Sequence, residues 1–440
     1  MPMRIAQTGR RAALILVTAV FLSSIAAGCA AALYLYGKPR PGWSAIPAAA
    51  VIQTLASSAL SEVAPSAPQS LRRSALMFTW LSLGELSIEA HRPLQTRRRA
   101  TPSAGPGAVL PLFARAGASA GAARRLVIGW TLDTGSANLI QTLRDSPGLT
   151  VLAPKWIQLD GSSGAINNTV EPSVVQAAQA RGVQVWAVVD NGFNAAQSHA
   201  VLRYQDTQTT LIDNIVNLAR RDHLSGINLD FEGLAAADRW NYARFVQRLA
   251  VRLRAVGMSL SVDLPPDIVS GQNSGPYNHA ALAASANYII LMGYDQYWGG
   301  DSQAGPTASL PWVKAGVTDM LHTGVPAAKL ILGVPFYTQD WTLDQNGAVS
   351  GSRALSLVQV HNLLAGLGAN PEWRPSLGVS YASFTQGGVR HEMWVISQRS
   401  LLLTSQYMAE NHLAGVAAWY LGLERPSTWW ALVQSVHSLA

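Results

Sequence analysis

Residues 224–234 read Leu-Ser-Gly-Ile-Asn-Leu-Asp-Phe-Glu-Gly-Leu, an apolar run with Asn228, Asp230 and Glu232 at alternate positions. Successive side chains of a β-strand point to opposite faces, so these three polar groups share one face of a predicted strand over 227–231. Carboxylates two positions apart lie roughly 6.6 Å from each other along a strand, so they repel unless one stays protonated. A general acid requires a protonated carboxyl, and we therefore expect catalysis at the end of this strand.

The sequence on both sides of this run alternates short apolar strands with amphipathic helices. Eight strands are predicted, over Leu126–Trp130, Thr150–Leu152, Val183–Val189, Ile227–Phe231, Ser259–Asp263, Tyr288–Met292, Leu330–Val334 and Val416–Trp419. Helical spacing of apolar residues predicts helices between them, such as 211–221 and 239–256. This order predicts an α/β fold, a (β/α)8 TIM barrel over 125–440. The interval before the eighth strand is too long for one crossover, which predicts a small α+β insertion at about 341–394.

The first 124 residues have a different composition. An uncharged stretch of 25 residues, Ala12–Tyr36, follows three arginines and is long enough to cross a bilayer as a helix. We expect residues 1–36 to be a signal anchor or a signal peptide, and 37–124 to be an Ala/Pro/Arg-rich, partly disordered linker. Positive charge before the span favours an export of everything after it. The protein is then expected in a bacterial inner membrane with its barrel in the periplasm, or secreted, or lipidated at Cys29.

Charge and cysteine content exclude several classes of protein. The formal net charge of +7 divides into +10 over 1–124 and −3 over 125–440. The barrel therefore offers no basic excess, and we expect no nucleic-acid partner. The single cysteine, Cys29, excludes a disulfide within the chain and a Cys/His zinc site, and the histidines show no metal-ligand spacing. We predict neither a metal nor a cofactor, and the sequence leaves the oligomeric state open.

Several motifs resemble glycoside hydrolase family 18, the chitinase-like family. Asn-Leu-Asp-Phe-Glu at 228–232 resembles the end of its Asp-x-x-Asp-x-Asp-x-Glu signature, and Met-Gly-Tyr-Asp-Gln at 292–296 its sixth-strand motif. Gly-Val-Pro-Phe-Tyr at 333–337 is similar to its seventh-strand motif, and Trp419 to its eighth-strand tryptophan. The combination resembles a branch that includes spore cortex hydrolases and the hydrolase module of deacetylase and glycosyltransferase fusion proteins. The resemblance covers roughly 125–440.

The resemblance implies a role for each matched residue. Glu232 would be the proton donor, Asp230 would orient the acetamido group of the substrate, and Tyr294 would donate a hydrogen bond to the acetamido carbonyl. Asp295 would hold a sugar hydroxyl, and Trp419 would form the floor under the reacting sugar. The other expected substrate-binding residues are Asn228, Gln296, Trp298 and Tyr337. Trp341 either lines a glycan subsite or belongs to the core, and Asp190 and Asn191 either face the cleft or cap a helix.

Two carboxyls on one strand cannot flank a scissile bond in the way of most glycosidases, whose pair faces across it at about 5–9 Å. They suit a substrate-assisted, retaining mechanism in which the acetamido oxygen of N-acetylglucosamine attacks its own anomeric carbon. The implied function is an exported hydrolase of a β-linked N-acetylglucosamine polysaccharide, either exopolysaccharide or peptidoglycan. A lectin-like glycan-binding protein and a structural part of an envelope polysaccharide system are the alternatives. Ser225 and Asn228 stand where the signature has Asp, which leaves open whether Asn228 reduces activity.

Overall fold

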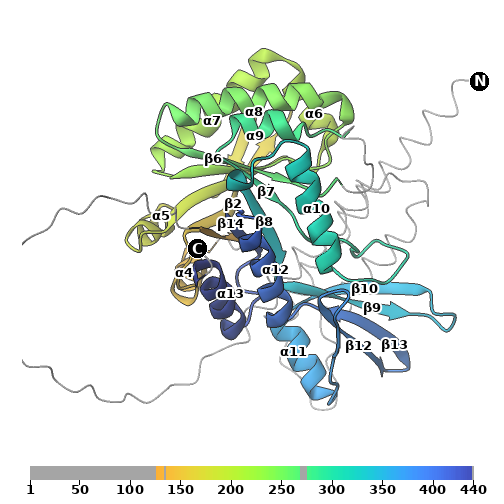
Figure 1. The fold of residues 1–440 in the computed structure, drawn as a ribbon. Coiled ribbons are helices and arrows are strands. Elements are labelled where there is room, and N and C mark those ends of the chain that lie inside the picture. Colours follow the sequence, from red (N-terminus) through yellow and green to blue (C-terminus); the bar gives the residue numbers. More distant parts are fainter. Residues whose placement is uncertain (1–124, 133–134, 268–274, 439–440) are drawn as a thin grey trace, which may run out of the picture. The chain divides into compact units, whose positions relative to one another are not determined.

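Eight parallel strands close into a barrel (Figure 1) in the computed structural model, which describes residues 125–132, 135–267 and 275–438. The barrel strands are β1 (Leu126–Thr131), β2 (Val151–Asp160), β4 (Gln184–Asp190), β5 (Gly226–Asp230), β6 (Ser259–Leu264), β7 (Tyr288–Leu291), β8 (Leu330–Pro335) and β14 (Gly415–Trp419). Each strand pairs with its neighbours in chain order, and β1 pairs with both β2 and β14. The closed barrel leaves no open edge among these eight strands, and the predicted (β/α)8 fold is confirmed.

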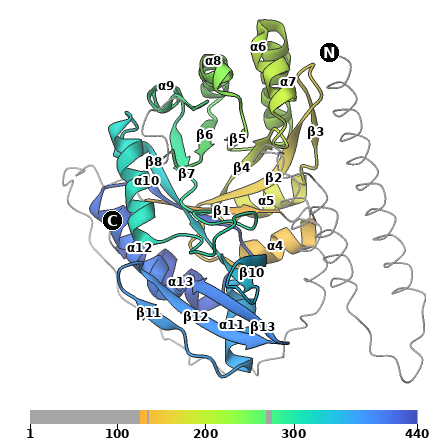
Figure 2. The same cartoon turned by 90° about the vertical axis from the view of Figure 1, so that its right-hand side faces the viewer.

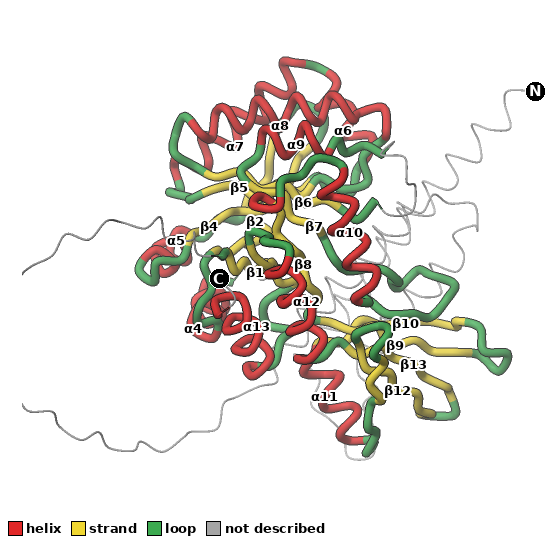
Figure 3. The backbone as a smooth tube through the Cα atoms, in the orientation of Figure 1, coloured by secondary structure: helices red, strands yellow, loops and turns green. Residues whose placement is uncertain are grey.

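Helices surround the barrel strands (Figure 3). They are α4 (Ser136–Asp145), α5 (Pro172–Gln179), α6 (Ala195–Arg203), α7 (Gln205–Arg221), α8 (Arg239–Arg254), α9 (His279–Ser285), α10 (Leu310–His322), α12 (Gln398–Glu410) and α13 (Pro426–Ser438), with 3-10 turns η2 (Ala236–Asp238) and η3 (Ala327–Lys329). Outward apolar side chains of the strands pack against these helices and form the larger core. Ile227 and Leu229 of β5 belong to this core, and Phe231, directly after β5, stacks on Tyr242 and Phe245 of α8.

The barrel interior is a second, smaller core. Its buried members include the aromatic side chains of Trp130, Trp186 and Tyr294, together with aliphatic side chains from six strands. The interior is therefore filled with side chains, as in other barrels of this size. The polar face of β5 points into this space, where Asn228 is fully buried. The predicted alternation of faces along the opening run is confirmed.

An antiparallel sheet is inserted between β8 and β14 (Figure 2). It contains β9 (Tyr337–Leu343), β10 (Val349–Ser356), β11 (Glu372–Arg374), β12 (Val379–Gln386) and β13 (Val389–Val395), with helix α11 (Leu357–Gly366) after β10. The strand order is β10-β9-β13-β12-β11. The structure thus contains the expected α+β insertion. It begins at Tyr337 rather than near 341, because only Phe336 separates β8 from β9.

Most strand ends differ from the prediction by one residue, and the differences at β5 and β2 change the description of the barrel. β5 ends at Asp230, so Glu232 lies in the following loop and not on the strand. β2 runs ten residues to Asp160 because it pairs with a short antiparallel strand, β3 (Ala165–Asn168), which no pattern predicted. The predicted membrane segment at 1–36 and the linker at 37–124 lie outside the described residues. None of the helices in the described ranges is long and apolar enough to cross a membrane.

Candidate active site

Asn228 connects three strands at the centre of the barrel. Its Oδ1 accepts a hydrogen bond from Trp130 Nε1 on β1 at 2.7 Å. Its Nδ2 donates to Ser261 Oγ at 3.0 Å and to Asp263 Oδ1 at 2.7 Å, both on β6. A buried amide with both ends hydrogen-bonded is stable in the interior, whereas an unpaired polar group there costs about 1–3 kcal/mol. Asn228 therefore holds Trp130 and Asp263 in place inside the barrel. Its expected contact with substrate stays a prediction.

Asp230 is a buried carboxyl whose pKa is shifted towards neutrality. Burial raises the pKa of Asp230 to about 6, the nearby charge of Lys155 opposes that rise, and Asp190 adds to it. Its Oδ1 is buried and has no hydrogen-bond partner among the described residues. Lys155 Nζ also lies 3.8 Å from Asp190 Oδ1, so one cation faces both carboxylates. The Oδ1 atom of Asp230 can therefore accept a hydrogen bond from a group that enters the barrel.

The backbone of Glu232 is held on both sides by one amide. Asn191 Nδ2 donates to the Glu232 carbonyl oxygen at 2.7 Å, and the Glu232 amide donates to Asn191 Oδ1 at 3.0 Å. Asn191 Nδ2 also donates to Ser198 Oγ on α6, at 2.8 Å. Asn191 is buried and does not cap α6, whose first turn is capped by Asn194. The amide fixes where the Glu232 side chain leaves the backbone.

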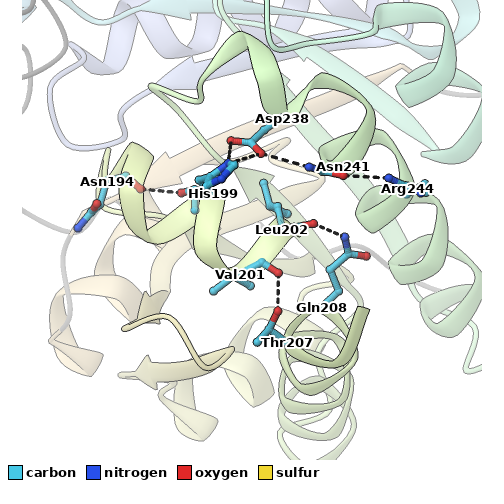
Figure 4. A network of polar contacts seen from close by, with 10 residues as sticks. Asn194, His199, Val201, Leu202, Thr207, Gln208, Asp238, Asn241 and Arg244 are labelled. Atoms are coloured by element: carbon cyan, nitrogen blue, oxygen red, sulfur yellow. Dashed lines mark hydrogen bonds and ion pairs between the residues drawn. The ribbon is translucent and has the colours of Figure 1, made fainter. Parts of the chain in front are cut away.

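The loop that carries Glu232 is also anchored at its far end (Figure 4). The fully buried carboxylate of Asp238 lies 2.8 Å from His199 Nδ1 of α6. Asn241 donates to the same carboxylate at 3.3 Å and accepts a hydrogen bond from Arg244 at 2.9 Å. These contacts tie the loop between β5 and α8 to two helices. Glu232 therefore lies on a loop with defined geometry at both ends.

Tyr294 and Asp295 lie just beyond the end of β7, after Met292 and Gly293, as the motif predicts. Tyr294 is buried, and its pKa is raised well above the usual value, first by burial and then by Asp263, Asp230, Glu232 and Asp295. The phenol therefore keeps its proton near neutral pH and remains a hydrogen-bond donor. The Tyr337 hydroxyl donates to Asp295 Oδ1, so the insertion contributes to the site through its first strand. Asp295 has a left-handed backbone, with φ +62°.

Trp419 ends β14 beside these groups. Its ring stacks on Tyr294 with a centroid distance of 6.1 Å and an interplanar angle of 17°. It also meets Trp130 edge-on at 5.6 Å. The Trp419–Tyr420 peptide bond is cis, and Trp419 is only half-buried. The structure thus brings Asp230, Tyr294 and Trp419 together at one end of the barrel, with Glu232 in the loop that leaves it.

The remaining expected binding residues lie in the loop after β7 and in the insertion. Gln296 Oε1 accepts a hydrogen bond from the Ser309 amide at 2.9 Å, so this side chain already stabilises the loop. Trp298 is 9% exposed. Trp341 is fully buried, and its Nε1 donates to the Gly305 carbonyl at 2.9 Å, which places it in the core. The binding roles of Gln296, Trp298 and Tyr337 stay predictions.

The sequence reasoning missed Asp263, which lies on β6 next to Asp230. Asp263 is 2% exposed, and burial together with the Asp230 charge raises its pKa well above the usual value. Trp130 and Lys155, on β1 and β2, were missed as well. The available signal was their position near the carboxyl ends of predicted barrel strands, where active sites of this fold lie. In the ranges that the structure describes, no cluster of His, Cys, Asp and Glu could hold a metal ion.

Comparison with known families supports the assignment that this geometry suggests. The model of the glycosyl hydrolases family 18 matches residues 136–424. This chain belongs to glycosyl hydrolases family 18. The barrel is therefore a glycoside hydrolase domain, which agrees with the positions of Asp230, Glu232 and the half-buried Trp419 at one end of its strands.

Individual relatives agree with the family. The chain is 25% identical to the uncharacterized glycosylase YvbX of Bacillus subtilis, over 58% of this chain and 76% of that protein. It is 27% identical to the cortical fragment-lytic enzyme of Bacillus anthracis, over 56% of this chain and only 58% of that enzyme. The crystal structure of a chitinase from Chromobacterium violaceum superimposes with a TM-score of 0.64 at 25% identity, covering 71% of this chain and 99% of that one. The predicted likeness to spore cortex hydrolases is confirmed, and the likeness to fusion-protein modules stays a prediction.

Proposed function

We propose that this protein hydrolyses a β-linked glycan containing N-acetylglucosamine by substrate-assisted catalysis with retention. The observation that carries the proposal is the arrangement at the end of β5, where Asp230 is buried in the barrel and Glu232 stands two residues further on a clamped loop. Because Asp230 and Glu232 both stand at the end of β5, they lie on the same side of a bound substrate. Neither can then act as the nucleophile opposite the other. The substrate's acetamido oxygen then supplies that nucleophile.

Each group has one task in this reaction. Glu232 gives its proton to the glycosidic oxygen while the acetamido oxygen attacks C1 and forms an oxazolinium ion. The Asp230 carboxylate, through its unpartnered oxygen, accepts the acetamido N–H and balances the positive charge of that ion. The Tyr294 hydroxyl donates to the acetamido oxygen and orients it. Glu232 then removes a proton from water, which attacks C1 on the face that the leaving group occupied and gives retention.

The substrate class follows from the chemistry and from the relatives. The mechanism needs an acetamido group on the sugar whose bond is cleaved. A chitinase and a cortical fragment-lytic enzyme are among the similar proteins, and both names point to polymers that contain N-acetylglucosamine. We propose exopolysaccharide or peptidoglycan as the polymer, outside the cytoplasm of a bacterium, because of the predicted export segment at residues 1–36. Protease treatment of intact cells and of lysed cells tests this location.

The deciding experiment compares the native chain with Glu232→Gln on N-acetylglucosamine oligomers, peptidoglycan and a fully deacetylated oligomer. We expect cleavage of an acetylated substrate by the native chain and a loss of about 10²–10⁴-fold in kcat for Glu232→Gln. Glu410→Gln, the same chemical change at an exposed position on α12, is the matched control and should keep full activity. Binding without cleavage by the native chain would establish the lectin-like alternative. Cleavage of the deacetylated oligomer would exclude the substrate-assisted mechanism.

A further inference from the structure

Asp230 and Asp263 lie side by side on neighbouring strands. The β5–β6 register pairs Asn228 with Ser261 and Leu229 with Val262, so the next positions along both strands are Asp230 and Asp263. Parallel neighbours of this kind are about 4.8 Å apart in the backbone. Asn228 Nδ2 contacts both Ser261 and Asp263, which shows that the side chains of these β6 residues point to the same interior as the polar face of β5.

The two carboxyls are both removed from solvent. Asp230 is 8% exposed and Asp263 is 2% exposed. Asp263 accepts a hydrogen bond from Asn228 through Oδ1 at 2.7 Å, whereas Oδ1 of Asp230 has no partner in the described part of the chain. Two adjacent carboxyls in a low-dielectric interior cannot both be ionised without a large cost, so the pair retains one proton. The protonated carboxyl can then donate a hydrogen bond to the ionised one.

We propose that Asp263 is a positioning residue that shares one proton with Asp230 and keeps Asp230 ionised during the reaction. This inference rests on the proposed function, because it assigns a partner to the carboxylate that faces the acetamido group. Asp263 holds the proton while Asp230 accepts the acetamido N–H. No proton enters or leaves the pair during formation and hydrolysis of the oxazolinium ion, since the glycosidic oxygen takes its proton from Glu232 and water returns one to it.

The surrounding charges agree with a pair that carries one negative charge. Lys155 on β2 is the cation that acts on Asp230, and Asp190 on β4 opposes it. Burial, Asp230 and Glu232 raise the pKa of Asp263, and the hydrogen bonds from Asn228 and Trp130 oppose that rise without cancelling it. Tyr294 after β7 and Tyr242 on α8 keep their protons, because burial and the carboxylates raise the pKa of each phenol. The carboxyls around Asp263 therefore outnumber the cation Lys155. This excess of negative charge favours the protonated form of Asp263.

Infrared spectroscopy tests the shared proton without relying on activity. The parent is the full chain with Glu232→Gln, which removes the other protonated acid expected in the site. At pH 7.5 we expect a carbonyl band of a protonated carboxyl in the parent and its loss after a further Asp263→Asn substitution. The matched control, Ser261→Ala, removes the other acceptor of Asn228 and should keep the band. A band that survives Asp263→Asn would overturn the proposal.

Activity profiles against pH give a second, independent readout. Asp263→Leu removes the donor beside Asp230, so the acid limb of kcat should move to higher pH by about one unit or more. Asp263→Asn keeps a neutral donor of the same shape and should leave that limb in place. A structural role alone would leave both limbs where they are in the native chain, and that result would also overturn the proposal. An inactive native chain would contradict the proposed function, while the infrared result would still decide this inference.

Discussion

Two buried aspartates in this protein have opposite environments. Asp340, on β9 of the insertion, is fully buried, and both of its oxygens are bound. Arg353 Nε donates to Oδ2 at 2.9 Å, and His391 Nδ1 lies 2.9 Å from Oδ1. Asp230, at the end of β5, is almost equally buried, but its Oδ1 has no partner among the residues that the structure describes.

The difference separates a carboxylate whose oxygens are both bound within the fold from one that has an unbound oxygen, as the proposed function requires. The carboxylate of Asp340 joins three strands of the inserted sheet, because its partners lie on β10 and β13. Asp230 costs stability when it is ionised, since burial raises its pKa and one oxygen gains no hydrogen bond in return. Natural proteins tolerate such a cost at sites where function requires it.

The largest expected effect is the loss of activity in Asp230→Asn. We expect kcat to fall by about 10²–10⁴-fold, because a neutral amide cannot balance the charge of the oxazolinium ion. The free energy of unfolding at neutral pH should stay the same or rise, because the buried charge is removed. Steady-state kinetics and urea unfolding of the same preparations measure both quantities. If Asp230→Asn lowered both kcat and the free energy of unfolding, Asp230 would stabilise the fold in the same way as Asp340.

The second effect is a dependence of stability on pH that Asp230 causes. The pKa of Asp230 is about 6 in the folded chain and near 3.8 in the unfolded chain, so the folded state binds more protons between these values. The free energy of unfolding should therefore fall as pH rises, by about 3 kcal/mol between about pH 4 and pH 6 from this group. Subtracting the curve of Asp230→Asn from that of the native chain gives the contribution of Asp230 together with its effect on Asp263. A flat difference would contradict the shifted pKa.

Asp340→Asn should reduce stability and leave kcat nearly unchanged, the reverse of Asp230→Asn. Removing one partner of a buried ionic group leaves the others unsatisfied, and we expect a loss of about 3 kcal/mol in the free energy of unfolding. The kcat of the folded protein should change by less than about threefold, since Asp340 contacts Arg353 and His391 and not the reacting groups. Thermal unfolding and kinetics below the midpoint give the two values. A catalytic loss as large as that of Asp230→Asn would place Asp340 in the active site.

The smallest effect is expected for Arg353→Gln. The Arg353 side chain is 44% exposed, so water can replace part of its interaction with Asp340. We expect a loss below about 1 kcal/mol, with His391 still hydrogen-bonded to the carboxylate. Urea unfolding at low and high salt checks this, because an exposed ion pair weakens with salt. A loss as large as that of Asp340→Asn would mean that Arg353 alone neutralises the buried charge.

The fold was more predictable than the details of the site. All eight barrel strands could be located because apolar, β-branched runs alternate with helical spacing along the chain. The hairpin of β2 with β3 could not, because residues 165–168 carry no alternating pattern strong enough to indicate a strand. The start of the insertion was displaced because a seven-residue strand follows β8 after a single residue.

The site residues on one strand were visible in the sequence, and those that depend on contacts between strands were not. Asp230 and Glu232 stand in a recognisable run, and Tyr294 and Trp419 stand in matching motifs. Asp263 lies in Ser-Leu-Ser-Val-Asp-Leu, which reads as an ordinary strand. Its importance comes from the β5–β6 register, which a single sequence does not contain. The contact of Asn191 with Glu232 likewise depends on loop geometry.

The contact between Asn191 and Glu232 involves the main chain of residue 232, and not its side chain. Asn191 binds main-chain atoms of residue 232, so a substitution of that side chain leaves both hydrogen bonds available. Under the proposed function, the Glu232→Gln variant is expected to bind its glycan without cutting it. Attached to a fluorophore, such a protein would report which glycan it recognises.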